Sequence, residues 1–177
     1  MSFSPAERLP RVVLDSNVWI DILVFDDPLA RPIAHALAER RIEAIIDARC
    51  LGELARVLDY PQFERFAVDK HAALAQVEGW ALLIAPPDDA VSPCVDAAVR
   101  LPQCRDRDDQ KFLELAHRAG AHWLVSKDKE LLRMAKRIAR DFGFSIGLPA
   151  AFTQTLHQAP LAETAVSSHL HPTPAGN

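Results

Sequence analysis

The sequence predicts an α/β domain in which helices flank a central parallel sheet to form three layers. Two observations lead to this prediction. Short apolar runs rich in β-branched residues alternate along the chain with longer segments whose apolar residues recur at helical spacing. The short runs are apolar throughout, which is typical of parallel strands buried on both faces. Strands that alternate with helices in this way imply right-handed crossovers and one common strand direction.

The first expected strand is Arg11-Val12-Val13-Leu14, which stops at Asp15-Ser16-Asn17 as a buried strand does when it ends in a functional loop. A strand at residues 79–84 is one of two possibilities. The preceding helix could continue through it, because periodicity does not decide for so short an apolar run. The further strands are expected at residues 42–46, 122–126 and 144–146.

Helices are expected between these strands, with aspartate caps at their starts and proline or glycine near their ends. The first should be capped by Asp26 or Asp27, with Pro28 near its first turn and an apolar face that runs to Arg40. Further helices are expected at residues 48–59, 69–78, 108 or 109 to 119, 130–140 and 149–157.

Length and composition narrow the class of protein. A chain of 177 residues with 49% hydrophobic content is close to the size of one α/β domain. We expect that domain at residues 11–157, followed by a loosely ordered tail at 158–177. Three cysteines without a paired spacing argue against a disulfide framework or a structural zinc site. With no run of the roughly 18 to 20 apolar residues that a membrane span needs, a cytoplasmic protein without a membrane partner is expected.

Charge is distributed unevenly along the chain. The formal net charge of -4 gives no overall attraction to nucleic acid. Residues 105–140, however, hold ten Lys or Arg and six Asp or Glu. This positive excess accompanies two acidic segments, where a polyanion and a cation could be received together. The same charges could equally form a solvated helix face with internal ion pairs.

Four acidic segments should meet at one edge of the predicted sheet. Asp15 and Asp128 directly follow expected strands, so both emerge at the carboxyl edge whatever the strand order. Glu53 lies in the first turns of the helix after the second strand, and Asp109 lies at a helix start near the same edge. Because gathered carboxylates repel each other and lose hydration, such a cluster usually holds a cation.

Carboxylate ligands from separate segments suit Mg²⁺ or Mn²⁺ better than a cage of cysteine and histidine does. Such a cation can activate a bound water and offset negative charge on a phosphoryl group. The sequence therefore indicates phosphodiester hydrolysis as the chemistry of this edge.

The acidic segments also resemble those of the PIN-domain ribonucleases, in particular the branch of toxin components of toxin–antitoxin systems. Asp15-Ser16-Asn17 resembles the opening motif of that family, and residues 53–58 resemble its glutamate helix. Residues 104–116 are close to the most distinctive stretch of the branch, and residues 121–132 are similar to its final strand and acidic loop. Together these matches span residues from about 11 to 153.

This resemblance implies a metal-dependent endoribonuclease with a PIN-like fold, an RNA substrate, a protein antitoxin as partner and a homodimeric assembly. It implies Mg²⁺ or Mn²⁺ bound by Asp15, Asp109 and Asp128. Glu53 and Asp106 would be further or water-mediated ligands, and Glu53 would share the catalytic role with the three aspartates.

Basic residues beside the acids are candidates for contacts to the RNA backbone. They are Arg105, Arg107, Lys127 and Lys129, each of which could instead pair with a neighbouring acid. Two residues depart from the pattern of the branch. Lys127 stands where glycine is common, and Glu130 stands where aspartate is common.

Each acid also has a plainer interpretation. Asp15 and Asp128 could cap the turns or helices that follow them, and Glu53 alone would be a solvated helix residue. One or more of Asp106, Asp108 and Asp109 should be a helix cap, and the sequence leaves open which of them ligates directly. Their joint occurrence on one side of the sheet is what favours a metal site.

Two other functions fit parts of the pattern. One is a catalytically inactive PIN-like module that binds RNA or a protein and keeps the acids as remnants. The other is a phosphoacceptor receiver domain, which needs paired acids after the first strand and a lysine after the last. Asp15 stands alone and Ser145-Ile146-Gly147 contains no lysine, so this second alternative ranks low. Apolar residues at 20–25 and 29–37 could form a dimer face or be buried within one chain.

Overall fold

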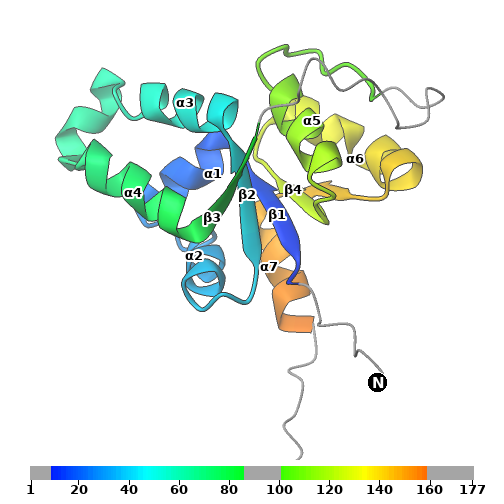
Figure 1. The fold of residues 1–177 in the computed structure, drawn as a ribbon, viewed down its shortest axis with the longest axis horizontal. Helices are drawn as coiled ribbons and strands as arrows, with labels where there is room; N and C mark the ends of the chain where they lie inside the picture. Colours follow the sequence, from blue (N-terminus) through cyan, green and yellow to red (C-terminus); the bar gives the residue numbers. More distant parts are fainter. Residues whose placement is uncertain (1–8, 86–100, 159–177) are drawn as a thin grey trace, which may run out of the picture.

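Five parallel strands lie at the centre of the computed structural model, which describes residues 9–85 and 101–158 (Figure 1). The strands are β1 (Arg11–Leu14), β2 (Glu43–Asp47), β3 (Ala81–Ile84), β4 (Trp123–Val125) and β5 (Ser145–Gly147). Their spatial order is β3-β2-β1-β4-β5, and all four neighbouring pairs are parallel. The predicted α/β class with a central parallel sheet is confirmed.

Helices cover both faces of the sheet. Helices α3 and α4 lie on one side and α5 and α6 on the other, while α7 packs against α2 and β4 (Figure 1). The helices are α1 (Ser16–Ile20), α2 (Arg31–Ala38), α3 (Ala48–Val57), α4 (Lys70–Trp80), α5 (Gln110–Arg118), α6 (Lys129–Phe142) and α7 (Pro149–Gln158). A π-helix, η1 (Asp21–Phe25), follows α1, and a 3-10 helix, η2 (Pro61–Phe66), follows α3. None of the helices in the described ranges has the length and apolar character needed to cross a bilayer.

The strand order reverses at β1. From β1 the chain adds β2 and then β3 on one side, and it later places β4 and β5 on the other side. In open parallel sheets, such a reversal opens a crevice outside the carboxyl ends of the two central strands. The fold therefore directs whatever follows β1 and β4 into one crevice.

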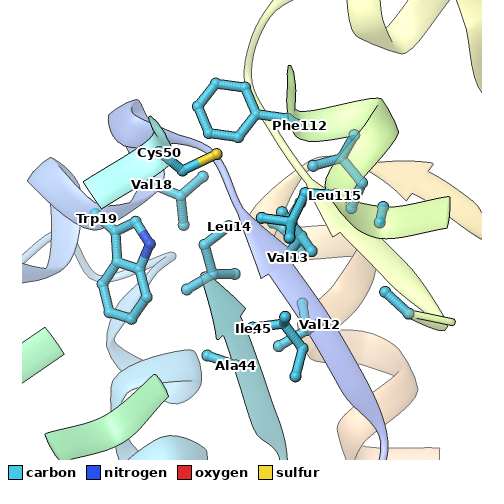
Figure 2. Close-up of a cluster of buried hydrophobic side chains, with 14 of the residues drawn as sticks. Val12, Val13, Leu14, Val18, Trp19, Ala44, Ile45, Cys50, Phe112 and Leu115 are labelled. Atoms are coloured by element: carbon cyan, nitrogen blue, oxygen red, sulfur yellow. The ribbon is translucent and has the colours of Figure 1, made fainter. Parts of the chain in front are cut away.

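Both faces of β1 are packed. Leu115 of α5 lies toward Val13, while Val18 and Trp19 of α1 lie beside Leu14 on the other face (Figure 2). Val12 and Val13 have no exposed surface, and neither has the neighbouring strand residue Leu124. This burial on both faces explains why the strand sequences are apolar throughout rather than alternating.

The predicted start of the helix before β2 is wrong. Asp26 adopts a left-handed backbone with φ of 46° at the end of η1, and the Asp27 side chain accepts a hydrogen bond in a turn. Helix α2 instead begins at Arg31, and Pro32 rather than Pro28 occupies its first turn. Pro28 and Pro32 are both suited to the first turn of a helix. Because residues 28–30 form a turn, the helix begins after it and contains Pro32.

Residues 79–84, for which the sequence allowed either a strand or a longer helix, contain the end of a helix and a strand. Helix α4 continues through Gly79 and Trp80, and β3 then begins at Ala81. The tail expected at residues 158–177 falls almost entirely outside the described ranges. Cys94 also lies outside them, while Cys50 and Cys104 are buried free thiols.

Replacing a buried strand residue should show how far stability depends on the packing of the sheet. Leu124→Ala removes a side chain with no exposed surface from β4 and should lower the free energy of unfolding by about 2 to 5 kcal/mol. The matched control is Leu83→Ala in β3, where the leucine is 54% exposed and the cost should stay below about 1 kcal/mol. Urea unfolding followed by circular dichroism measures both; similar losses would contradict the assigned burial.

Candidate metal centre

Asp15 lies between the two central strands at the crevice. Its backbone N–H donates to the carbonyl oxygen of Val125 at the end of β4, at 3.1 Å. Its Oδ1 accepts a hydrogen bond of 2.9 Å from the backbone N–H of Val18, which caps α1, and its Oδ2 accepts one from the Ser126 hydroxyl. The residue is 2% exposed. Burial raises the pKa of Asp15 to about 6, although the hydrogen bonds from Ser126 and Val18 lower it in part.

Asp128 is joined to Asp15 through Ser126. The backbone N–H of Asp128 donates to Ser126 Oγ at 2.9 Å, and that hydroxyl donates in turn to Asp15. Asp128 caps α6, because its Oδ1 accepts hydrogen bonds from the backbone N–H groups of Glu130 and Leu131 at 2.6 and 3.3 Å. Both capping bonds end on Oδ1, so Oδ2 is the oxygen that faces another ligand most freely.

Asp109 stands at the start of α5 and makes no capping hydrogen bond with its side chain. Burial raises the pKa of Asp109 to about 7, and repulsion from Asp128, Asp106 and Asp15 adds to the increase. The carboxylates of two other segments are therefore close enough to Asp109 to disfavour its ionisation. A divalent cation among them would relieve this repulsion.

Asp106 and Asp108 are both exposed. Asp106 accepts a hydrogen bond of 2.9 Å from the backbone N–H of Asp108, and it contributes to the raised pKa of Asp109. Asp108 is not among the main causes of that shift. Of the three neighbouring aspartates, Asp109 is the least exposed, and Asp106 and Asp108 lie on the surface beside it.

Glu53 projects from α3 and is held by two partners. The Ser16 hydroxyl donates to Oε1 at 2.8 Å, and the Lys111 ammonium forms an ion pair with Oε2. Glu53 is thus tied to the residue that follows Asp15, but its charge is already neutralised. The sequence reasoning did not single out Lys111. Its position two residues after Asp109 was the one available signal.

The sequence reasoning also missed two other buried acids, Asp47 and Asp21. Asp47 is 1% exposed at the end of β2, where its Oδ2 accepts hydrogen bonds from Arg118 at 3.0 Å and from Arg49 at 3.2 Å. Burial alone would raise the pKa of Asp47, but hydrogen bonds from Cys50 and the charge of Arg49 bring it below its ordinary value. Asp47 is therefore a stable anion within a structural ion-pair network.

The basic candidates do not share one environment. Lys127 donates to Asp21 Oδ1 at 2.7 Å, and Asp21 is itself 4% exposed, so Lys127 ties η1 to the loop after β4. Arg105, Arg107 and Lys129 are exposed beside the acidic segments. Lys127 therefore forms an ion pair with an acid, as one of the two interpretations expected. Arg105, Arg107 and Lys129 remain available to a ligand.

The acids have the donor chemistry for a hard cation but are not yet arranged around one. Within residues 9–85 and 101–158, no group of three or more acidic, histidine or cysteine side chains is already close enough to hold a metal ion. Asp15, Asp109 and Asp128 nevertheless offer carboxylate oxygens from three segments, and two of these residues have a raised pKa. The residues fit Mg²⁺ or Mn²⁺ if their side chains rotate toward each other.

The fold and this site define an α/β domain with a carboxylate-lined crevice at its switch point. The sequence model of the PIN domain matches residues 11–130, so the chain belongs to the PIN domain family. Members of this family are generally nucleases and usually bind divalent metals. An uncharacterized protein of Methanocaldococcus jannaschii, MJ1680, is 23% identical over 124 residues, which cover 70% of this chain and 74% of that protein.

The raised pKa values predict how the stability of the metal-free protein depends on pH. The folded pKa of Asp15, about 6, and of Asp109, about 7, both exceed the ordinary value of 3.8. The folded state then binds more protons than the unfolded state, so stability should fall as pH rises from about 4 to above 7. For Asp15 the loss should be on the order of 2 to 3 kcal/mol.

Urea unfolding at a series of pH values in the presence of a chelator measures this dependence. Asp15→Asn should flatten the curve, since the amide has nearly the same shape and keeps one acceptor oxygen but cannot ionise. Asp59→Asn, at an exposed surface ion pair, is the control and should leave the slope unchanged. An equal slope in the wild type and Asp15→Asn would contradict the raised pKa.

Proposed function

We propose that this protein is a divalent-metal-dependent endoribonuclease that hydrolyses RNA phosphodiester bonds. The observation that supports it most is the crevice between β1 and β4, where Asp15, Asp109 and Asp128 gather and, among the described residues, form no direct ion pair. Membership of a family whose members are generally nucleases supports the same class of reaction. Like charges gathered at a buried edge lower stability, and a bound cation offsets that cost.

Each residue of the crevice has a defined part in this proposal. Asp15, Asp109 and Asp128 hold the cation, with Asp106 as a ligand at the margin. When bound, Mg²⁺ or Mn²⁺ supplies an activated water and offsets charge on the phosphoryl group. Ser126 fixes the Asp15 carboxylate and the Asp128 backbone with one hydroxyl. Glu53 acts with them by holding Ser16, and thereby the loop that carries Asp15.

A line of basic side chains supports RNA as the substrate. It runs along α6 from Lys129, directly after Asp128, and Arg105 and Arg107 are further exposed cations in the neighbouring acidic segment. Lys129, Arg133, Lys136 and Arg140 are all exposed and recur at intervals of four, three and four residues, which places them along one helix face. Helix α6 holds five cations against two carboxylates, and the line spans about 16 Å at the rise of an α-helix. A phosphate backbone that leaves the crevice along α6 would follow this charge.

The biological setting is part of the proposal. We propose that the protein is the toxin of a type II toxin–antitoxin pair, acts in the cytoplasm as a homodimer, and is held in check by a protein antitoxin. The resemblance of residues 104–116 to the toxin branch supports this role. Ile20, Ile33 and Leu37 are buried within the chain, whereas Phe25 and Leu29 are 44% and 61% exposed. Phe25 and Leu29 are thus the part of the predicted dimer face available to a second copy.

The alternative, a catalytically inactive PIN-like module that binds RNA or a protein, has one observation in its favour. The acids of the described residues are not yet arranged as a metal cage. Metal-dependent cleavage separates the two functions, because an inactive module would bind without cleaving.

Cleavage of RNA should require both a divalent metal and the crevice aspartates. Asp15→Asn and Asp109→Asn should each lower the cleavage rate by at least about 100-fold, the upper end of what even outer-shell changes at metal sites cost. Gel assays on structured and single-stranded RNA, with Mn²⁺ or with a chelator, measure this loss, and circular dichroism checks the fold. Asp59→Asn should cleave as the wild type does. Equal rates in the wild type and both crevice variants would rule out the proposed chemistry, and binding without cleavage would favour the inactive module.

The line on α6 should set the salt dependence of RNA binding. Each phosphate contact contributes about 0.7 to the slope of log K against log salt for a single strand, so Arg133→Gln, Lys136→Gln and Arg140→Gln together should reduce the slope by about 2. Fluorescence anisotropy with a labelled single-stranded RNA measures the slope in an Asp15→Asn background, where cleavage does not interfere. A control with the exposed residues Arg40, Arg41 and Arg65 changed to Gln removes the same charge elsewhere, and an equal effect would show that only net charge matters.

A further inference from the structure

Lys111 places a cation at the acidic crevice. Its side chain is only 16% exposed, and its ammonium pairs with Glu53 Oε2 and donates to the carbonyl oxygen of Asp108. The ammonium also lies 5.0 Å from the ring centre of Phe112. A lysine with this many partners is fixed in position, unlike a surface lysine that exchanges freely with solvent.

Both oxygens of Glu53 are occupied by these contacts. Lys111 takes Oε2, and the Ser16 hydroxyl donates to Oε1 at 2.8 Å. Each partner is close in sequence to a crevice aspartate, since Ser16 follows Asp15 and Lys111 lies two residues after Asp109. Glu53 is therefore held beside the crevice with its charge neutralised and one contact on each of its two oxygens.

The three crevice aspartates, unlike Glu53, are not paired with a basic side chain in the part of the chain that the structure describes. Asp15, Asp109 and Asp128 form no ion pair within residues 9–85 and 101–158, and the repulsion of Asp128 and Asp15 acts on Asp109. With Glu53, these less exposed carboxylates carry four negative charges when all are ionised, and Lys111 offsets one of them. One divalent cation leaves a single negative charge, whereas a second would leave the site positive. Paired metals need ligands on both sides, and because Glu53 is already paired, a second ion would find free carboxylates only at the exposed Asp106 and Asp108.

We infer that Lys111 is a positioning residue that serves as a built-in cation: it holds Glu53 out of the metal's coordination shell and limits the crevice to one divalent ion. This inference rests on the proposed function, because it takes binding of a divalent cation at Asp15, Asp109 and Asp128 as given. The lysine thus occupies the electrostatic place that a second metal takes in two-metal nucleases.

Calorimetric titration of the full chain with Mn²⁺ tests the inference through the number of ions bound. The wild type should bind one ion, and Lys111→Met should bind two, since Glu53 then becomes a free carboxylate. The double variant Lys111→Met with Glu53→Gln should return to one ion, and Lys111→Arg should keep one. Electron paramagnetic resonance of bound Mn²⁺ gives a second readout, because two neighbouring ions broaden each other's signal.

Lys70→Met is the matched control, since Lys70 also forms an ion pair, at 2.5 Å to Asp59, but on the surface. It should bind one ion, as the wild type does. Two ions in the wild type, or one ion in a folded Lys111→Met, would overturn the inference while leaving the metal site in place. Absence of Mn²⁺ binding in the wild type would overturn the proposed function itself, and the inference with it.

If circular dichroism shows that Lys111→Met does not fold, the single variant Glu53→Gln is titrated instead. Because Glu53 is not a ligand in this arrangement, that variant should bind one Mn²⁺ with an affinity within about threefold of the wild type. A loss of affinity of tenfold or more would identify Glu53 as a direct ligand and overturn the inference.

Discussion

Repulsion between carboxylates at the carboxyl ends of β1 and β4 is the constraint that organises this protein. Three hydrogen bonds hold Asp15 in place. Its backbone N–H donates to the carbonyl oxygen of Val125, and its carboxylate accepts from the backbone N–H of Val18 and from the Ser126 hydroxyl. Burial and the negative charges of Asp128, Asp106 and Asp15 raise the pKa of Asp109 to about 7. A fold optimised for stability alone would have placed uncharged groups at this edge. This cluster is what connects the sheet topology to the proposed cation and to the proposed hydrolysis.

The structure divides the acids of the sheet edge into two groups. Asp47, Asp21 and Glu53 each face a basic side chain, and they act as structural anions that join neighbouring elements. Asp15 and Asp109 form no ion pair among the described residues. Burial raises the pKa of both, and repulsion from neighbouring carboxylates adds to the increase at Asp109, whereas the pKa of Asp47 is lowered. Burial alone does not separate the groups, because Asp15 and Asp47 are equally inaccessible. The presence or absence of a counter-charge separates them.

Membership of the PIN domain family and the geometry support each other from independent directions. The family match covers residues 11–130 and gives the general class, nucleases. The geometry adds which of the described acids form no ion pair, and it adds the direction in which positive charge extends along α6 from Asp128. The relative in Methanocaldococcus jannaschii is itself uncharacterized, so it contributes similarity over most of both chains rather than a function.

The sequence by itself determined the order of the elements, the parallel sheet, and the placement of Asp15 and Asp128 directly after strands. These features are local, because apolar periodicity and the residue that ends a strand can be read within a few positions. Only the tertiary structure decided the strand order, the start of α2, and the partners of Glu53 and Asp47. Arg118 reaches Asp47 across 71 positions, and Lys111 reaches Glu53 because α5 packs against α3. Contacts of this kind depend on how helices pack on a sheet, and no local pattern in the chain encodes them.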